Sequence, residues 1–205
     1  MGFSVPTLRL DSLEIARGHD GLLRGRPEPA VLLAMFGCAP GHAALLDRRV
    51  VRFRSPGAMP CTIRPVETVV MAPMLAPADT YALVVAIGVE VDGGGDVERL
   101  FGALEHAERW TGWEADAVDA PRHLEEIAVS CADRTRRVHL LLGGVAIEEG
   151  DSDDVVGASV TSLPAGVRSR RDARFAMLSP DSRNDWTSLA RVGMRAPLPR
   201  ARDER

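Results

Sequence analysis

Residues 81–91, YALVVAIGVEV, form the most hydrophobic run of the chain and decide the expected class of fold. The run has the length of one β-strand and is rich in valine, and it lies between Pro77 and the glycines that begin at Gly93. A continuous apolar run of this length, bounded by turn residues, is typical of a strand that is buried on both faces. These residues therefore predict a central strand.

The neighbouring segments predict further strands around this one. Residues 30–36, AVLLAMF, repeat the pattern of a strand buried on both faces, whereas residues 7–15 alternate leucine with charge and break register at Asp11 and Ser12. The basic residues of segment 49–54, RVVRFR, favour an edge strand. Residues 37–41 and the proline-rich residues 55–65 are expected to be loops. The other expected strands are residues 67–74, 137–147, 155–163, 174–178 and 185–194.

Two helices are expected between the strands. Apolar residues recur at helical spacing across residues 97–110, and Asp96 is placed to cap the first turn. Residues 121–132 predict a second, shorter helix, which begins at Pro121. Because strands dominate and do not alternate with helices, we expect a mainly β fold: a single antiparallel β-sandwich domain over residues 1–195, with a helical insertion around 96–132. Residues 196–205 are expected to be a disordered tail.

Composition excludes several classes of function. The chain has 205 residues, is 45% hydrophobic and carries a formal net charge of -4. No window approaches about 18 uninterrupted apolar residues, so a transmembrane segment is not expected. The mild acidity argues against a nucleic-acid partner. Cys38, Cys61 and Cys131 form no C-x-x-C pair, which indicates reduced thiols and a cytoplasmic location.

Two acidic segments resemble loops of the C2 domain family. Residues 27–31, PEPAV, are similar to the S-D-P-Y-V stretch that follows the first calcium loop of that family, and residues 149–157, EGDSDDVVG, are similar to its D-x-x-x-x-D-D-x-I-G stretch. The resemblance implies an eight-stranded sandwich in which both loops supply oxygen ligands to Ca²⁺ at one end. The ligands that it implies are Asp20, Glu28, Glu149, Asp151, Asp153 and Asp154. The same carboxylates also fit solvated turns, and this alternative stays open.

One basic cluster stands out. Arg168, Arg170, Arg171 and Arg174 surround Asp172. Such a cluster fits either a solvated loop or a contact with an anionic partner.

No catalytic motif is evident. Cys131, Asp133 and His139 lie within nine residues, but on an expected helix end and an expected strand, and the chain has no G-x-S-x-G elbow. No catalytic residue and no required cofactor are therefore expected.

The sequence thus predicts a non-enzymatic binding module that uses the loops at one end of a sandwich, with a protein partner. One alternative is Ca²⁺-dependent association with anionic lipid headgroups, and a second is a structural subunit of a larger assembly, for which an unprotected edge strand would be a sign.

Overall fold

The computed structural model describes residues 4–18, 28–39, 42–91, 155–166, 168–178 and 184–195. Its elements are all strands: β1 (Val5–Arg17), β2 (Pro29–Ala39), β3 (His42–Arg52), β4 (Cys61–Ile63), β5 (Val70–Met71), β6 (Tyr81–Glu90), β7 (Val155–Pro164), β8 (Ser169–Leu178) and β9 (Asp185–Arg195). The expectation of a mainly β chain is confirmed for these residues.

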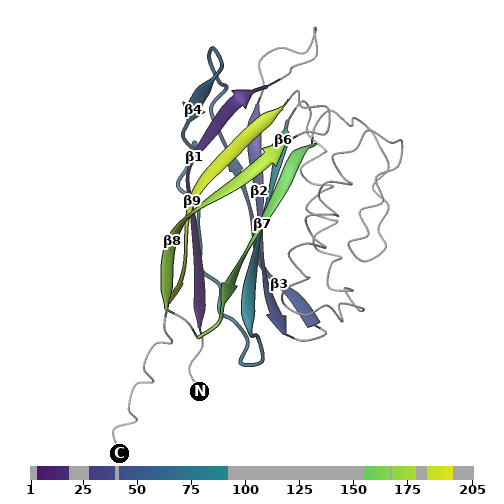
Figure 1. Cartoon of the computed structure of the whole chain (residues 1–205), viewed down its shortest axis with the longest axis vertical. Helices are drawn as coiled ribbons and strands as arrows, with labels where there is room; N and C mark the ends of the chain where they lie inside the picture. The colour runs from purple at the N-terminus through teal and green to yellow at the C-terminus, as the bar shows by residue number, and fades with distance from the viewer. Residues whose placement is uncertain are drawn as a thin grey trace, which may run out of the picture.

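The strands form two antiparallel sheets, which lie as two layers in Figure 1. Sheet A has the order β4-β1-β9-β8, and β5 also pairs with β1. Sheet B has the order β3-β2-β6-β7. The first and last strands of the chain are neighbours in sheet A, with a register that runs from Val5 opposite Arg195 to Arg17 opposite Asp185.

Both sheets contribute side chains to one core. In β1 the inward residues are Leu8, Leu10, Leu13 and Ile15, and all four belong to the core cluster. The step from Leu10 to Leu13 breaks the two-residue period because the β1–β9 ladder shifts register between Leu10 and Ser12. This irregularity lies where the sequence predicted a break. The largest buried side chains of sheet A are Trp186 from β9 and Phe175 from β8, and both belong to this core.

The two central strands of sheet B are buried on both faces. Along β2, the alternate residues Val31, Leu33 and Met35 face the shared core. The intervening residues Leu32 and Phe36 face the opposite side, and each is only 1% exposed. Strand β6 is likewise buried along its whole length. The two apolar runs thus form interior strands, as the sequence predicted, and the structure adds that they are neighbours in one sheet.

Several boundaries differ from the expectations. The expected loop at 37–41 is wrong in part, because β2 continues to Ala39. Its partner β3 begins at His42, which lies opposite Ala39. The expected loop at 55–65 contains β4, which is held by its pairing with β1. The expected strand at 67–74 is reduced to Val70–Met71, the two residues that pair with β1. Arg49–Arg54 was correctly assigned to an edge strand.

Other expectations lie outside the described residues. These are the helices at 97–110 and 121–132, the strand at 137–147 and the tail at 196–205. Within the described ranges, no helix has the length and apolarity that crossing a membrane requires.

Candidate functional site

The expected calcium ligands lie mostly outside the described residues. Five of the six are not among the described residues: Asp20, Glu149, Asp151, Asp153 and Asp154. Glu28 is described: it is exposed and immediately precedes β2. In the described ranges there is no group of three or more His, Cys, Asp or Glu side chains that could hold a metal ion. The ligand set therefore stays a prediction.

The segments that carry these carboxylates start from neighbouring strand ends. The backbone N–H of Val91, just after β6, donates to the carbonyl oxygen of Glu28 at 3.1 Å. At the same end of sheet B, Val89 of β6 lies opposite Val155, the first residue of β7. The two acidic segments, which are far apart in sequence, are thus attached to one end of sheet B.

The basic cluster seen in the sequence is divided by the alternation of β8. Arg171 is directed toward sheet B, where its Nη2 donates to the Thr161 hydroxyl at 2.9 Å and to the Ser162 carbonyl at 3.0 Å on β7. Arg170 and Arg174 lie on the other side of β8, which is the outer face of sheet A. Arg171 therefore joins the two sheets and does not belong to the same surface as Arg170 and Arg174.

Strands β1 and β9 add arginines to that outer face. We define the arginine face as the outer surface of sheet A that carries Arg9, Arg168, Arg170, Arg174, Arg191 and Arg195. Three carboxylates, Asp11, Glu14 and Asp172, are interleaved with them. The surface is therefore positive, although the whole chain has a net charge of -4.

Half of these arginines are paired with carboxylates. Asp11 lies between two of them: its Oδ2 is 2.8 Å from Arg191 Nε, and its Oδ1 is 3.0 Å from Arg9 Nε. Oδ1 accepts no hydrogen bond, so its contact with Arg9 is an ion pair without hydrogen-bond geometry. Arg174 Nη2 donates to Glu14 Oε2 at 2.8 Å.

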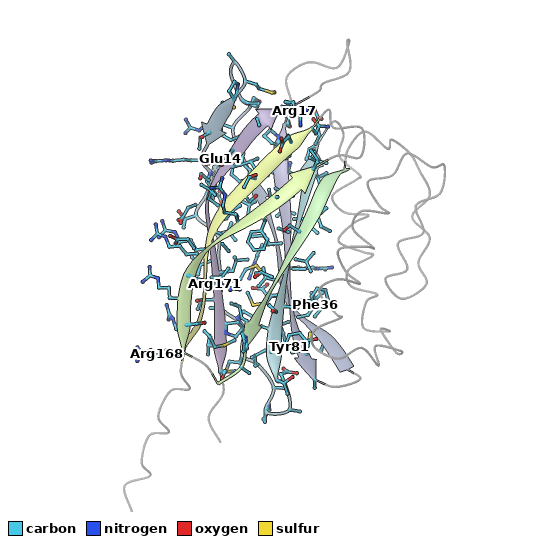
Figure 2. All side chains as sticks on the ribbon, in the orientation of Figure 1. Glu14, Arg17, Phe36, Tyr81, Arg168 and Arg171 are labelled. Atoms are coloured by element: carbon cyan, nitrogen blue, oxygen red, sulfur yellow. The ribbon has the colours of Figure 1, made fainter. Side chains whose placement is uncertain are left out.

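The other half gather at one corner, where no carboxylate of the described ranges forms an ion pair with them. In the β8–β9 ladder Arg170 lies opposite Gly193, and Ser169 lies opposite Met194. Arg168, which immediately precedes β8, and Arg195, the last residue of β9, therefore flank the end pair of this ladder. Figure 2 shows Arg168 at one end of the layers and Arg17 near the other. The sequence could not reveal this group, because Arg195 is more than twenty residues from the cluster in β8.

A buried thiol lies apart from these charges. Cys38 and Tyr81 are opposite one another on β2 and β6, and their side chains are hydrogen-bonded. The pKa of Cys38 is raised to about 12: burial is the largest cause, the bond with Tyr81 acts in the opposite direction, and the charge of Asp79 also raises the pKa. Burial also raises the pKa of Tyr81. Both groups are thus held in their neutral forms, which are poor nucleophiles and bases.

The raised pKa of the Cys38 thiol predicts that the free energy of unfolding falls at alkaline pH. The pKa of Cys38 is raised from 9.0 to about 12, so between these pH values the unfolded chain loses the thiol proton while the folded chain keeps it. The contribution is complete below pH 9 and is lost toward pH 12. We expect the free energy of unfolding, measured in urea from pH 8 to 11, to fall less steeply for Cys38→Ala than for the unmodified protein. Equal slopes would contradict the raised pKa.

Comparison with protein-family models and with curated proteins finds no match for this chain.

Proposed function

We propose that this chain is a non-enzymatic binding module that docks an acidic protein partner on the arginine face. The supporting observation is the gathering of six arginines from three segments of the chain on the exposed side of one sheet. Guanidinium groups form paired hydrogen bonds with carboxylates, which makes such a surface suited to Asp- and Glu-rich segments. A positive surface on an acidic protein also steers an anionic partner to one face.

The proposal places the partner on this sheet face, where every arginine is exposed. The ion pairs with Asp11 and Glu14 hold Arg9, Arg191 and Arg174 over the sheet. A prearranged arginine loses less side-chain entropy when a partner binds.

Calcium-dependent association with anionic lipid is the second candidate. It is supported by the attachment of both acidic segments to one end of sheet B, where Val91 is hydrogen-bonded to Glu28. Carboxylates from two such segments can converge on one Ca²⁺, and the ion would then present positive charge to a headgroup.

A structural subunit that assembles through strand edges is less favoured. One edge strand of sheet B, β3, carries Arg48, Arg49 and Arg52, and one edge strand of sheet A, β8, carries Arg170 and Arg174. Charged side chains on edge strands oppose pairing with another sheet.

The proposed function is tested by NMR on the full chain labelled with ¹⁵N, with a deca-glutamate peptide as the probe. We expect amide shifts confined to β1, β8 and β9, and an affinity that falls when NaCl is raised from 50 to 300 mM. The double variant Arg191→Glu/Arg195→Glu should bind at least ten-fold more weakly. Arg52→Glu/Arg54→Glu, which changes two exposed arginines elsewhere, should bind within two-fold of the unmodified protein.

The same spectra recorded with CaCl₂ and with a chelator separate the two candidates. Absent shifts with the peptide, or shifts confined to residues beside Glu28 and Val155, would exclude docking on the arginine face. Calcium-dependent shifts at Glu28 and Val155, together with calcium-dependent binding to anionic vesicles, would establish the second candidate in its place.

A further inference from the structure

The uncompensated corner of the arginine face differs from the rest of that surface. Arg9 and Arg191 lie against Asp11, and Arg174 lies against Glu14. For Arg168, Arg170 and Arg195, the described part of the chain contains no carboxylate within ion-pair distance. The nearest acidic position on β8 is Asp172, which is two residues from Arg170 and lies opposite Arg191.

This arrangement is unfavourable unless an anion binds to it. Like charges held close together on neighbouring strands repel each other and lower stability. Arg168 immediately precedes β8 and Arg195 ends β9 at the same end of the ladder, and Arg170 is two residues from Arg168. Gly193 lies opposite Arg170 and two residues from Arg195, so no side chain separates these two arginines on β9. Three guanidinium groups can therefore turn toward one bound anion.

We propose that Arg168, Arg170 and Arg195 bind one phosphate monoester dianion, carried on a phosphorylated side chain of the acidic partner. This inference rests on the proposed function and specifies the chemistry of one part of its surface. A phosphoryl group presents three acceptor oxygens, one for each of the three guanidinium groups, and close to two negative charges. A carboxylate has two oxygens and one charge, so it would neutralise less of the cluster.

A phosphorylated peptide fits this surface better than a membrane does. Asp11, Glu14 and Asp172 are interleaved with the arginines of the same outer face. A flat anionic membrane laid on the face would bring its headgroups against these carboxylates. A peptide can place its phosphoryl group at the corner and lie elsewhere along the sheet.

The test uses fluorescence anisotropy with the full chain and three labelled nonapeptides of glycine, alanine and serine. They differ only at the central position, which is phosphoserine, glutamate or serine. We expect the phosphoserine peptide to bind at least ten-fold more tightly than the glutamate peptide. Its affinity should rise from pH 5 to pH 7.5 with a midpoint near the second phosphate pKa of about 6, because the dianion is the bound form. The glutamate peptide should show no such rise.

Variants locate the site. Arg170→Gln/Arg195→Gln should remove the preference for phosphoserine, and Arg52→Gln/Arg54→Gln should keep it. All four positions are exposed, so melting temperatures are expected to stay close to that of the unmodified protein. Should a glutamine variant unfold, Arg170→Lys/Arg195→Lys keeps the charge but loses the guanidinium fork, and it should still weaken the preference.

The outcomes distinguish this site from the proposed function. Equal affinity for the phosphoserine and glutamate peptides, with deca-glutamate still bound to the arginine face, overturns the phosphate site and leaves the proposed function standing. Failure of deca-glutamate and of all nonapeptides to bind overturns both. Binding to vesicles that contain phosphatidic acid, with no preference for the phosphoserine peptide, overturns the peptide-borne phosphate and assigns the corner to a lipid headgroup.

Discussion

Phe36→Ala is expected to lower the free energy of unfolding by about 4 kcal/mol, a typical loss for deletion of a buried aromatic ring. Phe36 lies on the side of β2 that faces away from the core shared by the two sheets, yet it is 1% exposed. It lies opposite Leu83 of β6, which is also fully buried. Truncation therefore leaves a cavity in an apolar layer and does not merely trim a solvated surface.

The measurement is urea unfolding followed by circular dichroism. Leu189→Ala is the matched control, because Leu189 is a half-buried apolar residue on the outer face of sheet A. It should cost about 1 kcal/mol or less, since little apolar area is lost from the interior. Phe36→Leu keeps most of the apolar volume and should cost much less than Phe36→Ala. A loss below about 1 kcal/mol for Phe36→Ala would mean that this face of sheet B is solvated.

Gly157→Ala is expected to lower the free energy of unfolding by about 3 kcal/mol, since a methyl group must be forced against backbone. A Cβ at Gly157 in β7 would lie 2.8 Å from the amide nitrogen and 2.9 Å from the carbonyl oxygen of Leu178 in β8. Neither backbone atom can rotate away as a flexible side chain could. The φ of Gly157, +158°, adds strain for a residue with a side chain.

This substitution tests the contact between β7 and β8, where the two sheets approach each other. Strands β7 and β8 belong to different sheets, and they approach at Gly157 and again where Arg171 binds Thr161 and Ser162. Hydrogen exchange of Gly157→Ala should therefore quicken first in these two strands. Gly57→Ala is the control, because a Cβ there meets nothing within 4 Å; it should change stability by less than about 0.5 kcal/mol. Equal losses in the free energy of unfolding for Gly157→Ala and Gly57→Ala would contradict the close approach of β7 and β8.

The candidate site was predictable only in part. The segment with Arg168, Arg170, Arg171 and Arg174 is visible in the sequence as a basic cluster. Arg171 belongs to a different surface because side chains alternate along β8, which begins at Ser169. The sequence predicted this strand only from residue 174 onward. That Arg195 completes the corner depends on the pairing of β8 with β9 in this register. A register shifted by one residue would turn Arg170 and Arg195 to opposite faces.

Local hydrophobic patterns were enough to locate most strands and to identify the central ones. The apolar runs around Leu33 and Val85 can be shielded from water only inside a sheet, and this could be inferred without knowing which strands pair. The pairing of β1 with β9, and the meeting of three arginines that no carboxylate of the described residues neutralises, became evident only from the folded chain. Strand pairing depends on contacts between segments far apart in the chain, and local patterns carry no record of which segments will meet.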